Sequence, residues 1–308
     1  MQPLVLVNAL AGAAAEGDPA ELADRIGRAF AETGSGAEVR RFAPQDLISA
    51  LEQARRSDRP VVVAGGDGTV GAAVQLYAGT DTPLGIIPLG TYNLLAHDLG
   101  MSTDPEEAVR QIAGAEERRI DLGRMGRRYF HTLAGLGFFA RIARERAELR
   151  KETDAPKVVV AALAAVRSLA SADEIEVEID TGERRELLRT PAVLITNNPL
   201  DPDTWRRPRL DRGVFEINVV RGDVPLPLLQ GGLAALTGSW RESPDILTWK
   251  TAHATIRPSR SRVHLNVDGE VTRPRAPLRF AMAPAALTVL AARGPADYAV
   301  ETVEALVS

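Results

Sequence analysis

The chain has 308 residues, 45% of them hydrophobic and 25% charged, and a formal net charge of −4. This length predicts one large or two medium domains with ample material for a core, and the slightly acidic balance gives no sign of a nucleic-acid-binding protein. The chain contains no cysteine, which excludes disulfide bonds and thiolate metal sites.

The first 123 residues alternate between strand-like and helix-like segments. The first apolar run, PLVLVNA, is rich in Leu and Val, as expected of a strand buried on both faces. Asp18 and Pro19 then provide an N-cap and a first-turn residue for a helix. In chain order we expect strands at residues 3–9, 37–44, 59–68 and 83–91 and helices at residues 18–33, 46–56 and 69–77, with a fourth helix beginning near Tyr92 or Asn93.

This strand–helix order predicts a parallel sheet with helices on both faces. In such sheets, ligands bind beyond the carboxyl ends of the strands. Asn8, the Gly65–Thr69 loop and the Gly90–Asn93 loop all follow predicted strands. We therefore expect these three loops to share one edge of the sheet and to form a binding site there.

After about Leu122 short alternating stretches dominate, separated by Pro, Gly, Asp and Asn. Such a pattern is typical of an antiparallel sandwich or barrel. The expected strands lie within residues 174–180, 192–198, 213–220, 253–258, 262–270, 278–283 and 287–292. Helices are expected at residues 140–151, 157–170 and 225–236, and a last helix at about 295–308 is expected to pack back on the first domain.

Membrane contact, if it occurs, should be peripheral. The apolar run VVVAALAAV, residues 158–166, is far shorter than the ~20 residues that span a bilayer. The arginine-rich helix expected at residues 140–151 also carries glutamates, which favours an ordinary solvated face. Trp240 and Trp249 flank a polar loop, and we expect them to pack in the core.

The stretch VVVAGGDGTVG, Val61 to Gly71, has the character of a phosphate loop. Backbone N–H groups freed by its glycines can point at phosphate oxygens, and the following helix adds its positive N-terminus. No Lys-Ser/Thr pair follows the glycines, so this is not a Walker A loop. Asp67 would instead hold a Mg²⁺ ion that neutralises the phosphates. The alternative is a tight strand-to-helix turn in which Asp67 only caps the helix.

Several ordered motifs resemble the diacylglycerol kinase-like lipid kinases, which include bacterial diacylglycerol kinases and sphingosine kinases. The motifs are Asn8–Gly12, GGDGTV at 65–70, PLGTYN at 88–93, IDLGRM at 120–125, YFHTLAGLGFFARI at 129–142 and NVDGE at 266–270. The resemblance implies a three-layer α/β domain, residues 1–123, related to NAD kinases and phosphofructokinases. It also implies a β-sandwich lipid-substrate domain, residues 124–294, with ATP and lipid meeting in the cleft between the domains.

The resemblance also implies roles for single residues. Asp67 would bind Mg²⁺, Asp121 would be a second carboxylate that positions metal-bound water, and Glu270 would be the general base toward the lipid hydroxyl. Asp268 and Gly269 would shape the turn that presents Glu270. Residues expected to contact phosphates or nucleotide are Asn8, Gly65, Gly66, Gly68, Thr69, Gly90, Thr91 and Asn93. Without the family, VDGE predicts a plain hairpin turn, and both interpretations can hold together.

The chain departs from the family's pattern at several positions. Ala9 stands where the first loop usually has Pro, Leu94 where many members have Asp, and His97 where they have a phosphate-binding Arg. Asp98 lies one helical turn beyond Leu94 and could partly replace the lost acid. In the second domain Asp211 is kept, but Arg212 occupies the position of a structural Mg²⁺ ligand. We therefore predict that this structural metal site is absent or altered.

The sequence thus predicts an ATP-dependent lipid kinase that phosphorylates diacylglycerol or a similar lipid at a membrane surface. We expect a cytoplasmic protein, peripheral at the inner face of the membrane, with no nucleic-acid partner. A catalytically silent lipid- or nucleotide-binding protein stays open because of Leu94, His97 and Arg212. An NAD kinase is less favoured, since its Asn-Glu and Gly-Ser/Thr-x-Ala-Tyr motifs are missing. A homodimer through an exposed edge strand also stays open.

Overall fold

The computed structural model describes residues 2–10, 18–153, 159–160, 163–164, 167–168, 174–201, 206–221 and 245–292. The chain divides into two compact units. Of the described residues, unit 1 holds those up to Leu122 and 284–292, and unit 2 holds those within Gly123–Ala283. The second domain was expected to span residues 124–294, but its described residues 284–292 belong to unit 1. The helices expected at 225–236 and 295–308, and most of that at 157–170, lie outside the described residues.

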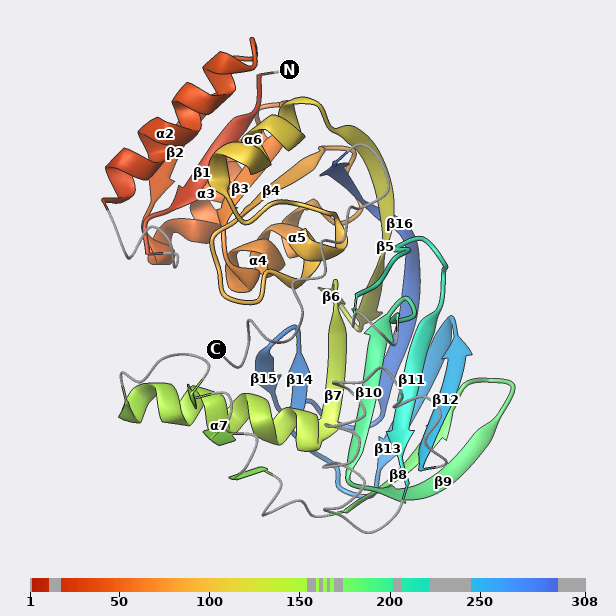
Figure 1. Ribbon diagram of the computed structural model, residues 1–308. Helices are drawn as coiled ribbons and strands as arrows, with labels where there is room; N and C mark the ends of the chain where they lie inside the picture. The colour runs from red at the N-terminus through yellow and green to blue at the C-terminus, as the bar shows by residue number, and fades with distance from the viewer. Residues whose placement is uncertain are drawn as a thin grey trace. The chain divides into compact units, whose positions relative to one another are not determined.

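Unit 1 is built on a parallel sheet with the strand order β2-β1-β3-β4-β16 (Figure 1). The strands are β1 (Leu4–Asn8), β2 (Glu38–Phe42), β3 (Val61–Gly65), β4 (Leu84–Pro88) and the end of β16 (Leu278–Ala291). All residues of β3 and β4 are buried, as their continuous apolar runs predict for strands covered on both faces. The parallel α/β architecture expected for this part of the chain is confirmed.

The helices of unit 1 cover both faces of the sheet (Figure 1). They are α2 (Pro19–Glu32), α3 (Leu47–Arg55), α4 (Asp67–Tyr77), α5 (Leu94–Asp98) and α6 (Pro105–Ala113). The connection from β1 through α2 leads to β2 at one edge of the sheet, whereas the connections through α3 and α4 lead toward β3 and β4 in the opposite direction. Because such crossovers are right-handed, α2 lies on one face of the sheet and α3 and α4 lie on the other. Accordingly, α2 packs with α6 and α3 packs with α4. The Asp18 carboxylate accepts a hydrogen bond of 2.8 Å from the Ala20 N–H, which confirms the predicted N-cap.

Unit 2 contains two antiparallel sheets, which confirms the predicted sandwich. One sheet has the order β12-β11-β10-β7-β14-β15, and the other has β16-β13-β8-β9, with β5 paired to β16 and β6 paired to β5. Their bounds are β5 Glu116–Met125, β6 Arg128–Phe130, β7 Leu133–Gly137, β8 Ile175–Asp180, β9 Arg185–Thr190, β10 Ala192–Asn197, β11 Phe215–Val220, β12 Ile246–Thr251, β13 His253–Pro258, β14 Leu265–Val267 and β15 Glu270–Thr272. Strands β9 and β12 were not anticipated. The strands expected at 278–283 and 287–292 are one continuous strand, β16, with Ala285 at φ 49°.

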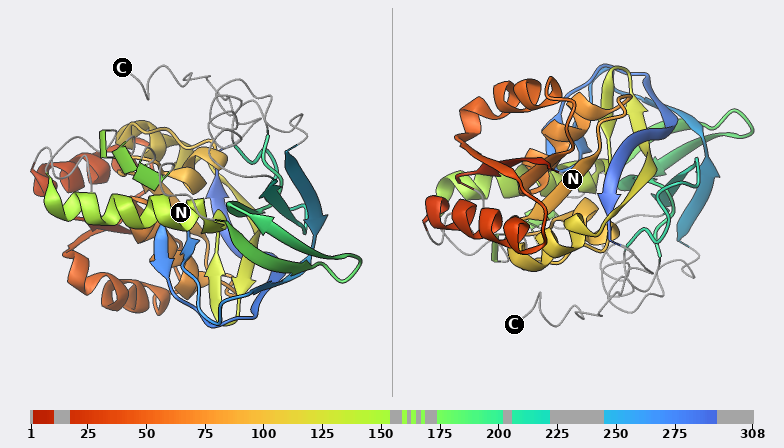
Figure 2. Two further views of the ribbon diagram at one scale, coloured as in Figure 1. Left: turned by 90° about the horizontal axis from the view of Figure 1, so that it is seen from below. Right: turned by 90° about the horizontal axis from the view of Figure 1, so that it is seen from above.

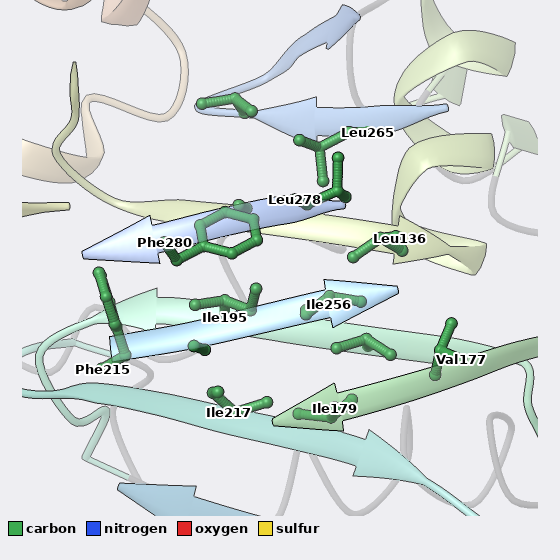
Figure 3. Close-up of a cluster of buried hydrophobic side chains, with 14 of the residues drawn as sticks. Leu136, Val177, Ile179, Ile195, Phe215, Ile217, Ile256, Leu265, Leu278 and Phe280 are labelled. Atoms are coloured by element: carbon green, nitrogen blue, oxygen red, sulfur yellow. The ribbon is translucent and has the colours of Figure 1, made fainter. Parts of the chain in front are cut away.

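The core of unit 2 fills the space between its two sheets (Figure 3). Apolar side chains from both sheets meet there, among them Ile195 and Ile217 from one sheet and Ile256 from the other. The Phe130 ring stacks on Phe215 with 5.7 Å between ring centroids. Partly buried Trp249 packs against this cluster, as expected, whereas Trp240 lies outside the described residues.

The long helix α7 (Phe138–Glu152) begins two residues earlier than predicted and packs on β7, β10, β14 and β15 (Figures 1 and 2). It follows β7 through Gly137, which has φ 63°. A Cβ at Gly137 would lie 2.0 Å from the Pro191 carbonyl oxygen, so this strand-to-helix turn requires glycine. Of the helices that the structure describes, none is long and apolar enough to cross a membrane.

Candidate functional site

In unit 1 the carboxyl ends of neighbouring strands gather the predicted phosphate-binding loops. The register pairs Asn8 with Phe42 and Gly65 with Pro88. The Asn8 side chain donates a hydrogen bond of 3.0 Å from Nδ2 to Thr69 Oγ1. This bond ties the end of β1 to the first turn of α4, so the loops after β1, β3 and β4 lie together at one edge of the sheet.

Two of the four loop glycines, Gly65 and Gly90, are required by packing within the protein, and a Cβ at Gly66 would make a tight contact of 3.1 Å with the Gly90 Cα. A Cβ at Gly65 would lie 2.6 Å from Thr69 Oγ1, and one at Gly90 would lie 2.6 Å from the Gly66 Cα. These contacts are closer than real Cβ atoms tolerate. Gly68 differs, because it is exposed and no atom lies within 4 Å of the position of its Cβ. The backbone at Gly68, in the first turn of α4, is therefore open to a ligand.

Asp67 is the first residue of α4 and binds the start of the next helix. Its carboxylate accepts hydrogen bonds of 3.1 Å from the Asn93 N–H and 2.9 Å from the Leu94 N–H. Gly66, not Asp67, occupies the N-cap of α4, so the alternative that Asp67 merely caps its own helix is wrong. A carboxylate offers about four lone-pair sites, and these two bonds leave capacity for a cation.

The donor set at Asp67 fits a magnesium ion. Mg²⁺ is commonly held by one or two carboxylates together with substrate phosphates and water. Among the described residues, no group of three or more acidic or histidine side chains could hold a metal ion without such partners. The role of Asp67 as a Mg²⁺ ligand stays a prediction.

The Gly90–Asn93 loop is held in shape by its own asparagine. Asn93 lies at φ 46° and is 5% exposed. Its Oδ1 accepts from the Gly90 N–H and its Nδ2 donates to the Gly90 carbonyl oxygen, both at 2.8 Å. Both polar atoms of the Asn93 side chain are therefore hydrogen-bonded within the loop. Thr91, in the same loop, is exposed to solvent. Leu94 and Asp98 begin and end α5, one turn apart as expected.

Asp121 lies in β5 and is 3% exposed. Its carboxylate accepts a hydrogen bond of 2.9 Å from the Ala285 N–H, at the residue where β16 takes its left-handed conformation. Asp121 thus fastens β5 to β16. A role for Asp121 in positioning metal-bound water stays a prediction.

In unit 2 the NVDGE motif forms the predicted hairpin between β14 and β15. Asp268 and Gly269 have φ values of 49° and 88°, and Val267 pairs with Glu270 across the turn. The Asp268 carboxylate accepts three backbone hydrogen bonds of 2.8–3.0 Å, from the N–H groups of residues 131, 132 and 133. Asp268 therefore anchors the hairpin to the start of β7.

Glu270 extends from this anchored turn with 67% of its side chain exposed. Its Oε2 lies 2.6 Å from Arg128 Nη2. Sequence reasoning missed Arg128, and no sequence signal identifies it, because 142 positions separate the two residues. The ion pair leaves the second carboxylate oxygen of Glu270 available to another donor.

Asp211 lies where the structural metal site is predicted to be absent or altered. Both carboxylate oxygens of Asp211 lie 2.7 Å from Arg209 nitrogens. Hydrogen bonding from Arg209 lowers the pKa of Asp211. The Arg212 N–H donates to Asn198 Oδ1 at 2.8 Å. Whether this region binds a metal stays a prediction.

Sequence reasoning also missed a cavity of about 360 Å³ at the carboxyl ends of β1 and β2. Its lining includes Leu6, Arg40, Arg41 and Phe42. Arg40 pairs with Glu38, whereas exposed Arg41 has no ion-pair partner among the residues that the structure describes. Both arginines lie within the strand predicted at residues 37–44, close to its carboxyl end.

Comparison with known proteins gives a consistent result. Residues 2–125 match the diacylglycerol kinase catalytic domain family. A diacylglycerol kinase of Mycobacterium tuberculosis is 29% identical over 251 residues, covering 76% of this chain and 77% of the relative. A diacylglycerol kinase of Staphylococcus saprophyticus is 28% identical over 251 residues, covering 77% and 79%.

Two solved structures from Bacillus anthracis str. Sterne share the fold. One superposes with a TM-score of 0.78 at 19% identity and covers 96% of both chains. The other, named a diacylglycerol kinase, gives a TM-score of 0.70 at 18% identity and covers 96% of this chain and 98% of that one. With the sequence motifs and the phosphate loop, these matches confirm that the chain is similar to the diacylglycerol kinase-like lipid kinases.

Proposed function

We propose that this protein is an ATP-dependent kinase that transfers the γ-phosphoryl group to the hydroxyl of diacylglycerol or a similar lipid. The observation that carries the proposal is the open first turn of α4. Gly68 is unobstructed there, and Asp67 is fixed beside it by two backbone N–H groups. A helix N-terminus with free N–H groups binds phosphate, and the adjoining carboxylate supplies a place for the counter-ion.

The nucleotide would occupy the same edge of unit 1. Its triphosphate would lie over Gly65, Gly66 and Gly68, and its remainder would extend toward Asn8 and the cavity at the ends of β1 and β2. Exposed Arg41 lines that cavity. It would supply positive charge in place of the phosphate-binding arginine that family members have where this chain has His97. Mg²⁺, held by Asp67 and phosphate oxygens, would neutralise charge on the transferring group.

The acceptor would be activated by Glu270. Its free oxygen would take the proton of the lipid hydroxyl while the hydroxyl oxygen bonds to the γ-phosphorus and ADP departs. Arg128 holds the other oxygen at 2.6 Å and would fix the direction of the carboxylate. Asp268 would act as a positioning residue, since its three backbone bonds set the turn that carries Glu270.

The acceptor lipid also sets the place of action. Diacylglycerols with long acyl chains dissolve very little in water and reside in membranes. We therefore propose peripheral contact with the inner face of the cytoplasmic membrane. The second candidate function is a silent lipid- or nucleotide-binding protein. Leu94 favours it, since a side chain that is 39% exposed stands where many family members have an acid.

Transfer of label tests the proposal. The protein would be incubated with γ-labelled ATP, Mg²⁺ and micelles of diacylglycerol, monoacylglycerol, sphingosine, ceramide or phosphatidylglycerol. Asp67→Ala and Glu270→Gln would run beside Glu107→Gln, a control that breaks another exposed Glu–Arg pair, with Arg110. Label in one lipid, lost in the first two variants and kept in the control, would support the proposal. ATP binding with no transfer to any lipid would favour the silent protein.

A further inference from the structure

Unit 2 exposes a group of arginines that lack acidic partners. Arg260, Arg262, Arg273 and Arg275 are all exposed. Within the part of the chain that the structure describes, none of the four forms an ion pair or side-chain hydrogen bond. A β-bridge joins Arg262 to Arg275, so the arginines on the two sides of the β14–β15 hairpin lie next to each other. We call these four residues the arginine surface.

The acids within the same stretch form no ion pair with it, and Glu174 and Glu176 line a pocket together with Arg260. Between residues 259 and 275 the acidic side chains are Asp268 and Glu270. Asp268 is held by three backbone N–H groups, and Glu270 is paired with Arg128. By contrast Arg257, just before this stretch, is paired with Glu178 at 2.7 Å.

Helix α7 carries charges of both signs, since Arg144 lies 3.5 Å from Glu145 and Lys151 lies 3.5 Å from Glu148. It packs on β14 and β15 (Figures 1 and 2). Partial burial, together with the charges of Arg144 on α7 and Arg273, lowers the pKa of His264. The like charges of Arg144 and Arg273 both act on His264, which immediately precedes β14. Such crowding destabilises the free protein and is offset when a polyanion binds.

Two exposed aliphatic side chains lie on a helical segment that packs against α7. Val160 and Ala164 pack on Leu149 of α7, while Val159 and Leu163 are 53% and 40% exposed. Residues four apart on a helix share a face, so the exposed pair forms a small apolar surface on a segment attached to α7.

We infer that the arginine surface docks this protein on membranes that contain anionic phospholipids. The inference rests on the proposed function, because a lipid acceptor requires the protein to reach a bilayer. It adds the binding surface and the lipid charge that this surface recognises. A nucleic acid fits less well, since no Phe, Tyr or Trp lies between residues 259 and 275 to stack on bases.

Vesicle sedimentation without ATP or diacylglycerol tests the inference. One set of vesicles contains phosphatidylcholine alone and the other contains added phosphatidylglycerol. The test variant is Arg262→Gln/Arg273→Gln/Arg275→Gln. The control, Arg28→Gln/Arg55→Gln/Arg56→Gln, removes the same charge from exposed residues of unit 1. A lysine triple at the three test positions guards against misfolding, since it keeps the charge and should bind.

The parent protein should sediment with phosphatidylglycerol vesicles and be released by salt. Each basic residue near an anionic surface contributes about a fivefold gain, so the test variant should bind about 100-fold more weakly. The control and the lysine triple should bind like the parent. Equal binding by the test variant, equal binding to uncharged vesicles, or binding to an oligonucleotide but not to the vesicles would overturn the inference.

Kinase assays separate this inference from the proposed function. The test variant should phosphorylate a dispersed short-chain diacylglycerol like the parent and lose turnover only on phosphatidylglycerol vesicles. If no lipid is phosphorylated but vesicle binding still depends on the three arginines, the docking surface stands and the kinase proposal fails. If turnover on phosphatidylglycerol vesicles is unchanged in the test variant, the kinase stands and the docking surface fails.

Discussion

Gly68→Ala should make the protein more stable and weaken its binding of ATP. The two effects have different origins. Gly68 is a helical residue of α4, with no atom within 4 Å of the position of a Cβ. The protein alone therefore has no steric reason for glycine there, and the remaining reason is the ligand that approaches this backbone.

The expected magnitudes follow from this geometry. Replacing glycine by alanine where the conformation permits it stabilises a protein by about 0.4–1 kcal/mol, because the unfolded chain loses freedom. A phosphate oxygen bound by the N–H groups of this turn would lie about 2.7–3.2 Å from a nitrogen. A methyl group on the same turn competes for that space. We expect ATP to bind at least about tenfold more weakly, a loss of about 1.4 kcal/mol.

Denaturant unfolding and calorimetric titration with Mg-ATP measure the two quantities. Gly27→Ala is the matched control, since it lies within helix α2 and its Cβ would meet Val39 at an ordinary 3.7 Å. It should gain similar stability and bind ATP like the parent. Gly65→Ala should instead lose stability, because its Cβ would lie 2.6 Å from Thr69 Oγ1. Unchanged ATP affinity in Gly68→Ala would refute the phosphate-loop assignment.

Four further outcomes are expected. Asp268→Asn should lose about 1.5–3 kcal/mol in denaturant unfolding, because an amide cannot replace a carboxylate that accepts three N–H groups; unchanged stability would contradict the anchoring role. Glu270→Gln should change stability by less than about 0.5 kcal/mol, since its pair is exposed, yet abolish label transfer. Arg41→Gln should raise the KM for ATP and leave that for lipid unchanged, as steady-state kinetics would show. Arg273→Gln should raise the pKa of His264 toward its ordinary 6.5 in an NMR titration. Because the folded pKa of His264 is depressed, the unfolded chain takes up the proton first, and stability falls as pH drops below about 6.5; Arg273→Gln should lessen that fall.

Local patterns in the sequence determined much of unit 1 and its loops. Continuous Leu, Ile and Val runs located β1, β3 and β4, because strands covered on both faces have no polar side to alternate with. Asp18 and Pro19 located the start of α2, since both act through the helix's own first turn. Asp268 and Gly269 located the hairpin, because their left-handed φ values are what its tight turn demands.

Local patterns failed where an element depends on distant partners. Strand β9 alternates buried or half-buried with exposed residues along most of its length, but its arginine and glutamate content conceals the pattern. Strand β16 contains a left-handed alanine at position 285, which predicts a break. Its pairing with β13 and β4 on either side of Ala285 keeps it continuous.

Some features of the site could be identified from the sequence, and others could be identified only from the tertiary structure. The sequence by itself identified Asp67, Glu270 and the glycines as candidates, because their spacing and turn chemistry are local properties. Only the tertiary structure decided that Asp67 binds the start of α5 and that Arg128 pairs with Glu270. Only the tertiary structure distinguished Gly68 from the glycines required by packing. Only the tertiary structure showed that Arg262 and Arg275 of the arginine surface lie next to each other. Each of these facts depends on which atoms the fold brings within a few ångströms, and that proximity is set by the packing of segments far apart in the chain.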